Sequence, residues 1–487
     1  MSSQNIKIFL KNNIRLNTQD LEPKVLELIK ESLLFTNPKF ESLKKLKYST
    51  RGVKEKIPLY YQDGISIFFP RGFYKQLKSG LESFNYNVSE VDLRTSKTIE
   101  LNINPIPLRD HQKASIDLIL KNETGLISQP PGSGKTVLSL EMFRRLSQKT
   151  IVITDRKNIA EQWKERAKDF LGIECSTIGD GNFDYSKDLT IASIQTLSNV
   201  ESTDPFYDEF GLVIVDEAHH SSALTWFNVI GNFNAKYVYG VSATPDRENG
   251  TYDLVKIAIG DVISEVKRDK LYDDKTLVRP EIRCIETNFY CDYYPSHSKN
   301  SCHEYSGCKK DLTTKKTHSN NYSQVTKELT EDVARAKLIA THIKDNQHLK
   351  QIVVSKRFKQ LDLIASELSN LGVEGVVYLT GKEDLKKRTE VVEFAGKNKC
   401  VVLSTLADEA LDIPELEVIH LVYPTRNAPL LTQQIGRVER HHKDKDNCVV
   451  YDYVDKSTPI LWMQFVDRRI NVYNKNNYTI KTNFQKR

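Results

Sequence analysis

A glycine-rich loop between an apolar run and a helix-like run constrains this chain more than any other feature. Residues 129–136 read QPPGSGKT; the stretch TGLIS precedes them and KTVLSLEMFRRL follows. A strand, a glycine loop and a helix start in that order place main-chain N–H groups around an anion. Lys135 then neutralises the anion, and the Thr136 hydroxyl can hold Mg²⁺. One departure is Gln129, where the general pattern has glycine. The predicted phosphate-binding loop contains Pro131, Gly132, Ser133, Gly134, Lys135 and Thr136.

The second feature is an apolar strand that ends in two carboxylates, GLVIVDEAHH at 211–220. Asp216 at the strand end can position Mg²⁺, and Glu217 can orient and deprotonate a water that attacks a phosphate. For the motif DEAH (216–219) alone, the alternative interpretation is an ordinary acidic loop at a strand end. The phosphate loop upstream in the same domain favours the catalytic interpretation.

Apolar β-like runs alternate with helix-like stretches in two separate parts of the chain, which predicts parallel sheets covered by helices on both faces. The expected fold class is therefore α/β, with two tandem parallel-sheet domains and a small α+β N-terminal module. We assign residues 1–100 to the module, 101–268 to the first domain, 269–330 to a linker or insertion, and 331–487 to the second domain.

Composition excludes several classes of protein. With 487 residues, of which 39% are hydrophobic and 28% charged, the chain is neither a small disulfide scaffold nor a membrane-embedded protein. No apolar run reaches the roughly 18 residues of a spanning helix, and the N-terminus lacks a signal-peptide core. We expect an intracellular, cytoplasmic protein, and seven cysteines without a regular framework suit a reducing compartment.

The net charge of +6 is concentrated at one end of the chain. The first hundred residues contain 17 Lys and Arg against 11 Asp and Glu, whereas the remainder is balanced. A basic module on a neutral body is typical of an attachment that engages a polyanion such as DNA. Excess lysine as a solubility device, and packing of the module on the first domain, are the alternatives.

An ordered set of motifs resembles a known family. After the phosphate loop and DEAH come SATP at 242–245, STLADEALDIP at 404–414 and QQIGRVER at 433–440, while LRDHQ at 108–112 lies ahead of the loop. Together they resemble superfamily 2 helicases and translocases. TDRKNIAEQW at 154–163, IPELEVIHLVYP and VVYDYVD point to the branch of XPB-like and phage branch-migration DNA helicases.

The resemblance implies two RecA-like domains that hydrolyse ATP with Mg²⁺ and move 3′ to 5′ on branched or duplex DNA, in recombination, repair or replication of a phage or mobile element. Arg109 and Gln112 would contact adenine, since the Gln112 amide offers both a donor and an acceptor. Arg437 and Arg440 lie three residues apart, so we expect them on one helix face, presenting guanidinium groups to the γ-phosphate. The remaining implied roles are catalysis by Gln433, a cross-cleft contact by Asp412, and coupling through His219, Ser242 and Thr244.

Nucleic-acid contacts are expected where polar residues follow apolar strands. Each candidate has an ordinary solvated strand end as its alternative, because phosphate contacts use common residue types. The candidates are Thr154, Arg156, Gln195, Thr196, Ser355, Lys356, Arg357, Ser404 and Thr405.

A polar segment between the two domains contains further possible metal ligands. They lack the paired CxxC hairpins of common structural zinc sites, so zinc is possible but not favoured. The set comprises Cys291, Cys302 and Cys308 with His297, His303 and His318.

The leading hypothesis is an ATP- and Mg²⁺-dependent DNA helicase or translocase with no membrane partner. The alternatives are an RNA helicase and a translocase or switch subunit that needs protein partners to separate strands. The sequence leaves those protein partners open.

Overall fold

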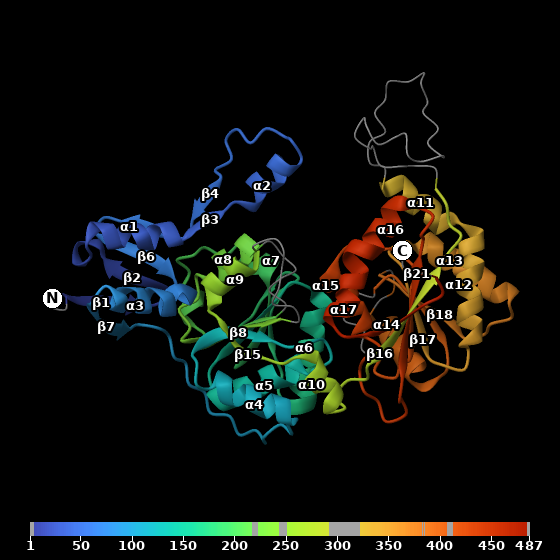
Figure 1. Cartoon of the computed structure of the whole chain (residues 1–487). Coiled ribbons are helices and arrows are strands. Elements are labelled where there is room, and N and C mark those ends of the chain that lie inside the picture. Colours follow the sequence, from blue (N-terminus) through green and yellow to red (C-terminus); the bar gives the residue numbers. More distant parts are fainter. Residues whose placement is uncertain are drawn as a thin grey trace. The chain divides into compact units, whose positions relative to one another are not determined.

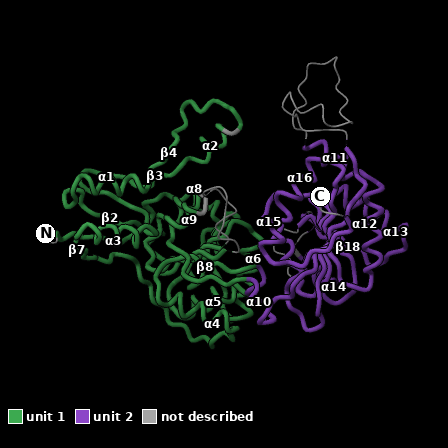
Figure 2. Tube along the Cα trace, in the orientation of Figure 1, with its two compact units in different colours: residues 1–130, 134–267 green, residues 131–133, 268–487 purple. Residues whose placement is uncertain are grey.

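The computed structural model describes residues 4–216, 223–242, 251–291, 322–381, 383, 385–406 and 413–484, and it contains two units (Figures 1 and 2). The first unit comprises residues 1–130 and 134–267, and the second comprises residues 131–133 and 268–487. The two units are described separately below.

The first unit begins with a five-stranded sheet in the order β5-β6-β2-β1-β7. Burial alternates along β2 and β6, as expected for a sheet with one face on a core and one face open. Side chains of α1 and α3 join the buried face in one hydrophobic core. The elements are β1 (Gln4–Leu10), β2 (Asn13–Asn17), α1 (Pro23–Ser32), β5 (Tyr61–Asp63), β6 (Ser66–Pro70), α3 (Tyr74–Ser83) and β7 (Tyr86–Asp92), with short 3-10 turns at Thr18–Asp20 and Arg71–Phe73.

An arm projects from this module between α1 and β5 (Figure 1). It consists of the two-stranded sheet β3 (Leu34–Thr36) and β4 (Lys56–Pro58), which carries α2 (Pro38–Lys45). Asn37 caps α2: its side chain accepts a hydrogen bond from the Lys39 N–H, and Pro38 occupies the first turn, where a missing N–H costs nothing.

The rest of the first unit is an eight-stranded sheet in the order β11-β10-β12-β9-β13-β14-β8-β15. All neighbours are parallel except β10 and β11, and β9 and β13 are buried along their whole length, which is typical of a parallel sheet covered on both faces. The strands are β8 (Thr124–Ser128), β9 (Thr150–Thr154), β10 (Ser176–Gly179), β11 (Asn182–Phe183), β12 (Leu189–Ser193), β13 (Leu212–Asp216), β14 (Tyr237–Ser242) and β15 (Val262–Glu265). The helices are α4 (Asp110–Ile119), α5 (Lys135–Leu146), α6 (Lys157–Leu171), α7 (Ile194–Leu197), α8 (Ala223–Ile230) and α9 (Thr251–Ile259), with a 3-10 turn at Pro205–Asp208.

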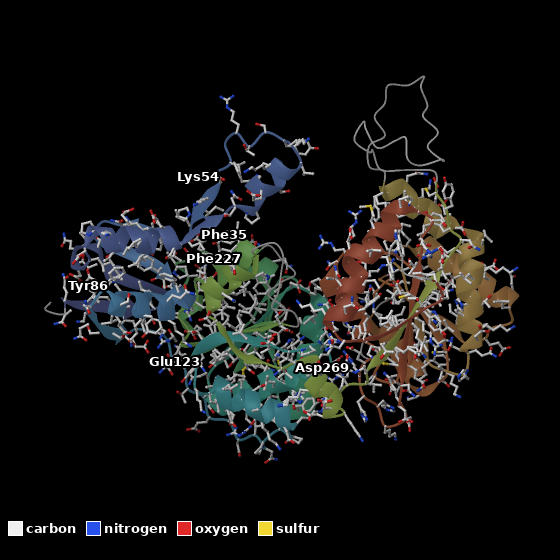
Figure 3. All side chains as sticks on the ribbon, in the orientation of Figure 1. Phe35, Lys54, Tyr86, Glu123, Phe227 and Asp269 are labelled. Atoms are coloured by element: carbon white, nitrogen blue, oxygen red, sulfur yellow. The ribbon has the colours of Figure 1, made fainter. Side chains whose placement is uncertain are left out.

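The module packs on this sheet domain rather than hanging from it. Leu254 of α9 belongs to the module's core, and Phe35 of β3 and Phe227 of α8 pack against that core (Figure 3). A Cβ on Gly72 would lie 2.2 Å from the Lys256 carbonyl oxygen, so only glycine permits the close approach to α9. The first unit therefore contains the packing of the module on the first domain that sequence analysis gave as an alternative, and DNA engagement by the module stays a prediction.

The second unit is built on a seven-stranded, fully parallel sheet in the order β18-β19-β17-β20-β21-β16-β22. The strands are β16 (Pro280–Glu286), β17 (Gln351–Val354), β18 (Val376–Leu379), β19 (Val401–Ser404), β20 (Val418–Leu421), β21 (Cys448–Val454) and β22 (Thr479–Thr482). The helices are α10 (Arg268–Asp273), α11 (Tyr322–Glu331), α12 (Val333–Asp345), α13 (Phe358–Asn370), α14 (Leu385–Lys397), α15 (Ala428–Ile435), α16 (Pro459–Gln464) and α17 (Ile470–Lys475), with a π-helical turn at Phe465–Arg469.

The predicted fold class is confirmed: two tandem α/β domains follow a small strand-rich module. Residues 280–286 form β16, a strand of the second sheet, although they lie inside the range 269–330 that sequence analysis assigned to a linker or insertion. Within the described residues, no helix has both the length and the apolar character that crossing a bilayer requires.

Candidate active site

The phosphate-binding loop has the main-chain geometry of an anion cradle. It joins the buried strand β8 to α5, and the helix begins at Lys135 directly after Gly134. Gly132 and Gly134 have φ angles of 79° and 87°, a left-handed conformation that other residues adopt only with strain. Glycines of this kind let successive N–H groups of a loop turn toward an anion, and the start of α5 adds its partial positive charge. Lys135 and Thr136 are half-buried at this point.

Gln129, the departure from the general loop pattern, anchors the base of the loop. Its main-chain N–H donates to the Ser242 carbonyl oxygen at 3.0 Å, and its side-chain Nε2 donates to Ser115 Oγ at 3.1 Å. The Ser264 hydroxyl also donates to Ser115 Oγ, at 3.0 Å. The side chain of the fully buried glutamine therefore ties the end of β8 to Ser115 of α4, a bond that glycine could not make.

Gln112 holds the other end of the loop. Its Oε1 accepts from the Arg109 N–H at 2.9 Å, and its Nε2 donates to the Gly134 carbonyl oxygen at 3.2 Å. A Cβ on Gly134 would lie 2.5 Å from that Nε2. Both ends of the amide that we expect to contact adenine are therefore engaged by main-chain groups, whereas Arg109 is exposed. The adenine contact of this pair stays a prediction.

Asp216 ends β13, and a tryptophan positions its carboxylate. Trp163 of α6 donates its indole N–H to Asp216 Oδ2 at 2.7 Å, and both residues are buried. Trp163 is a core residue with 2% exposure, and sequence analysis missed this hydrogen bond. The spacing between the two residues carries no signal for it, because α6 and β13 are distant in sequence and meet only in the fold.

Parallel pairing brings the chemical groups of the first sheet to one edge. Asp216 is in register with Val241 of β14, and Ser242 is in register with Ser128 of β8, immediately before the loop. The carboxyl ends of these three strands thus meet where the phosphate loop starts, as is usual for ligand sites in open α/β sheets. The arrangement brings Asp216 and Ser242 to the loop's edge of the sheet.

The expectation that Arg437 and Arg440 share a helix face is wrong. α15 ends at Ile435, Arg437 lies in the turn that follows, and Arg440 forms an isolated bridge with Leu277. Both arginines are partly exposed, while Gln433 is buried within α15. We call residues 436–440 the arginine loop.

The reason for this conformation is Glu439, a fully buried carboxylate that sequence analysis did not single out. Arg268 of α10 donates to Glu439 Oε2 and, at 2.8 Å, to the Tyr478 hydroxyl. Tyr272 donates to Glu439 Oε1 at 2.5 Å, and the Val278 N–H donates to the Glu439 carbonyl oxygen at 2.7 Å. These side-chain and main-chain hydrogen bonds hold the chain in a non-helical conformation. Arg437 and Arg440 lie on either side of Glu439 in the sequence.

The same cluster is charged despite its burial. Burial opposes charge on Arg268, yet the adjacent Glu439 carboxylate raises the pKa of Arg268 above its ordinary value. Burial also raises the pKa of Tyr272, so its hydroxyl keeps the proton that it donates to Glu439. Breaking such a pair leaves a buried charge without compensation, which makes the cluster a strong structural constraint on the arginine loop.

Lys445 supports the loop from its other end. Its ammonium group donates to the Arg440 carbonyl oxygen at 2.9 Å and to the Pro414 carbonyl oxygen at 3.3 Å. Only 3% of Lys445 is exposed, and burial lowers its pKa to about 8. Lys445 thereby links the arginine loop to Pro414, the last residue of the 404–414 motif.

The predicted nucleic-acid residues gather at the strand ends of each sheet. In the first unit, Thr154 is in register with Ser193, and Gln195 donates to the Asp155 carbonyl oxygen at 3.0 Å, next to Arg156. In the second unit, the Ser355 N–H donates to the Ser404 carbonyl oxygen at 3.1 Å.

Burial separates these candidates into two groups. Thr154, Ser355 and Ser404 are buried; the Ser355 hydroxyl accepts from the Arg357 N–H, and the Ser404 hydroxyl donates to the Leu379 carbonyl oxygen. The side chains that reach the surface in whole or in part are those of Arg156, Gln195, Thr196, Lys356, Arg357 and Thr405.

Several predicted residues lie outside the described part of the chain: Glu217, His219, Thr244, Asp412 and, from the zinc set, His297, Cys302, His303, Cys308 and His318. Cys291 is described; it is buried, and its thiol contacts Glu328 Oε2 at 3.0 Å. Among the described residues, no group of three or more His, Cys, Asp or Glu side chains could hold a metal ion.

Two family models match the two sheet domains. Residues 105–247 match the model described as type III restriction enzyme, res subunit, and residues 334–442 match the helicase conserved C-terminal domain. The chain belongs to the superfamily 2 helicases. It is an ATP-hydrolysing enzyme, and membership of this family implies use of ATP and Mg²⁺.

The helicase is similar to proteins from cells and viruses. It is 26% identical over 380 residues to the DNA 3'-5' translocase XPB2 of Sulfurisphaera tokodaii, covering 72% of this chain and 82% of that protein. It is 24% identical over 448 residues to a protein of Acanthamoeba polyphaga mimivirus named as an ATP-dependent RNA helicase, covering 89% and 79% of the two chains.

Among solved structures, the helicase resembles a fragment from Vibrio vulnificus described as an HsdR subunit of a type I restriction enzyme. The TM-score is 0.55 at 17% identity, and the match covers 78% of this chain and 69% of that one. At this identity the likeness shows the fold alone.

Proposed function

We propose that this helicase is a DNA helicase or translocase that couples ATP hydrolysis to movement on DNA and to remodelling of branched or duplex DNA. The observation that carries the proposal is the anion cradle at the start of α5, which lies at the same sheet edge as Asp216. In this arrangement Lys135 would neutralise the triphosphate, and Thr136 and Asp216 would hold Mg²⁺, while Trp163 orients the Asp216 carboxylate.

The remaining steps use residues of both domains. Bound Mg²⁺ supplies Lewis acidity at the phosphates. Glu217 takes a proton from the attacking water, and Arg437 and Arg440 stabilise charge on the γ-phosphate. His219, Ser242, Thr244, Gln433 and Asp412 couple these events to movement. Arg109 and Gln112 contact adenine.

The arm of the N-terminal module supports DNA as the partner. Between residues 34 and 58 the chain carries seven lysines and arginines against two glutamates, so most of the module's excess charge lies on the arm. Figure 3 labels one of these lysines, Lys54, which lies just before β4. A projecting basic segment neutralises backbone phosphates and releases their counterions, which strengthens binding regardless of base sequence.

Unwinding of a labelled forked DNA by the purified chain tests the proposal. Separation that requires ATP and Mg²⁺ is the expected result. Matched RNA forks and unbranched duplexes define the substrate, and a chain that unwinds RNA forks but leaves DNA forks intact contradicts the proposal.

Two alternatives keep specific support. The mimivirus relative is named as an RNA helicase, and backbone tracking alone does not distinguish the sugars. The restriction-enzyme family model favours a translocase that works with partner subunits. DNA-stimulated ATP hydrolysis without strand separation by the isolated chain is the result that the second alternative predicts.

A further inference from the structure

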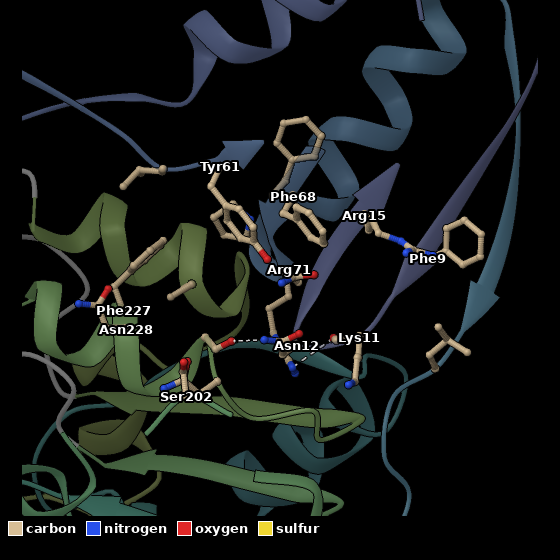
Figure 4. Close-up of a pocket in the computed structure, with 18 residues that line it drawn as sticks. Phe9, Lys11, Asn12, Arg15, Tyr61, Phe68, Arg71, Ser202, Phe227 and Asn228 are labelled. Atoms are coloured by element: carbon tan, nitrogen blue, oxygen red, sulfur yellow. Dashed lines mark hydrogen bonds between the residues drawn. The ribbon is translucent and has the colours of Figure 1, made fainter. Parts of the chain in front are cut away.

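The open face of the module's sheet carries a row of aromatic and cationic side chains. Phe9 on β1 pairs with Arg15 on β2, Arg15 pairs with Phe68 on β6, and Phe68 pairs with Tyr61 on β5. Direct cross-strand partners point to the same face of a sheet. Phe9, Arg15, Phe68 and Tyr61 therefore form one continuous ladder across four strands, as Figure 4 shows.

The ladder is well ordered without being part of the core. The rings of Tyr61 and Phe68 stack at 5° with centroids 4.3 Å apart, and the Arg15 guanidinium lies 4.4 Å from the centre of the Phe9 ring. Tyr61 is 55% exposed, whereas residues on the opposite face, such as Ile14 and Phe69, are 1% exposed. Phe9, Arg15 and Phe68 are partly exposed, and a contiguous aromatic surface that reaches solvent is characteristic of a binding site.

A cavity of about 630 Å³ extends from the ladder to the neighbouring sheet domain. Phe227 and Asn228 of α8 and Asn232 line it on that side, and Lys11 and Asn13 line it on the module side (Figure 4). The described residues around this cavity include three cationic side chains, several asparagine amides and no carboxylate. Flat rings, amides that can pair with base edges, and cations for phosphates are the groups that single-stranded nucleic acids require.

Arg71 adds an independent sign of an anionic ligand. It lines the cavity, is 7% exposed, and donates to the carbonyl oxygens of Phe233, Ala235 and Lys11. No carboxylate within the described chain pairs with it, and its Nε has no hydrogen-bond partner there. Burial lowers the pKa of Arg71 to about 9. A buried cation with no counter-charge raises the local affinity for an anion.

We propose that the Phe9–Arg15–Phe68–Tyr61 ladder and the adjoining cavity bind unpaired nucleotides of single-stranded DNA. Bases stack on the exposed face of Tyr61 and along the ladder, and Arg15, Lys11 and Arg71 attract the phosphates. Duplex DNA is excluded as the ligand because its bases have no free faces. The site rests on the proposed function for its choice of DNA, and it gives the helicase a grip on the displaced strand outside the two motor domains.

Binding of a short labelled oligo-dT to the full-length chain, without ATP, tests the site. Tyr61→Ala is expected to weaken binding about tenfold, since base–aromatic stacking contributes on this scale. Tyr61→Phe keeps the ring and is expected to bind as the unaltered chain does. Phe84→Ala removes another exposed aromatic side chain of the module and serves as the control. Thermal melting shows that each variant is folded, and basal ATPase is expected to be unchanged.

A crosslinking measurement makes the test independent of DNA bound elsewhere on the chain. Oligo-dT containing 5-iododeoxyuridine is expected to crosslink to the peptide that carries Tyr61 or Phe68, and excess duplex is expected to leave that crosslink in place. Three results would each overturn the ladder as a binding site. They are unchanged affinity of Tyr61→Ala for oligo-dT, crosslinks confined to other peptides, and equal competition by duplex DNA. Preferential binding of oligo-rU replaces DNA by RNA as the ligand and overturns the proposal as stated.

The experiments distinguish an error in the proposed function from an error in the assignment of the ladder as a binding site. If the unaltered chain unwinds forks and Tyr61→Ala binds oligo-dT as well as the unaltered chain does, only the assignment of the ladder is wrong. If the unaltered chain neither binds DNA nor shows DNA-stimulated ATPase, the proposed function and the assignment of the ladder are both wrong.

Discussion

The phosphate loop and the arginine loop are held in place by different means. The phosphate loop obtains its conformation mainly from consecutive residues, namely a buried strand, glycines with positive φ and a helix start, and neutral hydrogen bonds of Gln112 and Gln129 brace its two ends. The arginine loop obtains its conformation from Glu439, whose partners Arg268, Tyr272 and Tyr478 are remote in sequence. Main-chain geometry dominates in the first loop and a buried charged cluster dominates in the second.

This difference teaches how each loop responds to change. Substitutions in the phosphate loop remove groups that touch the ligand, so activity falls while the fold survives. Substitutions in the cluster act on the fold of the second unit first and on activity through the displaced arginines.

The largest expected effect follows Lys135→Ala. ATPase activity falls at least about a hundredfold, because the triphosphate loses its direct cation, while the melting temperature stays close to that of the unaltered chain. Steady-state ATPase and thermal melting measure the two responses. Lys113→Ala removes an exposed lysine of α4 and serves as the control. Normal turnover of Lys135→Ala contradicts the active-site assignment.

The next effect follows Glu439→Gln, which leaves the Arg268 guanidinium buried beside a neutral amide. The free energy of unfolding is expected to fall by about 3 kcal/mol, with ATPase reduced through the arginine loop. Denaturant titration and ATPase assays check both. Glu415→Gln, a partly exposed carboxylate 3.8 Å from His442, should change stability by less than about 1 kcal/mol. Equal stability of the two variants shows that the cluster does not hold the loop.

A smaller effect is expected for Trp163→Phe, which keeps the buried ring but removes the N–H that orients Asp216. The Mg²⁺ concentration for half-maximal ATPase should rise about tenfold, the usual scale for losing a hydrogen bond to a metal ligand. Trp226→Phe changes an equally buried tryptophan of the same unit and should leave the Mg²⁺ dependence unchanged. Identical Mg²⁺ dependence in both variants removes the positioning role from Trp163.

An effect confined to alkaline pH is expected for Lys445. Its pKa lies at about 8 in the folded chain against an ordinary 10.5, so the unfolded chain binds more protons between these values. This group therefore makes the unfolding free energy rise as pH increases from 8 to 10.5 and contributes no pH dependence below 8. Lys445→Met should lack this part of the rise in denaturant titrations at several pH values. If the unfolding free energies of the unaltered chain and of Lys445→Met change with pH in the same way, the lowered pKa of Lys445 is wrong.

Sequence analysis anticipated features that depend on neighbouring residues. The phosphate loop could be predicted from the sequence because its glycines, its lysine and the flanking strand and helix are contiguous. The alternation of β-like and helix-like runs predicted both parallel sheets. The helical placement of Arg437 and Arg440 failed because their spacing was considered without Glu439, whose partners no local pattern identifies. The bond between Trp163 and Asp216 was invisible for the same reason.

The N-terminal module shows the same division. Charge counting predicted a basic attachment, whereas the alternating burial along Ser66–Pro70 appears only in the structure, because Ile67, Phe68 and Phe69 are all apolar. Pairing alone decided that Phe9, Arg15, Phe68 and Tyr61 share one face, because strands β1, β2, β5 and β6 come from separate segments. By itself the sequence determined the class of fold and the chemistry of the phosphate loop, since both rest on short-range periodicity and main-chain conformation. The tertiary structure decided which charges are buried together and which rings form a surface, since those depend on strand register and long-range packing.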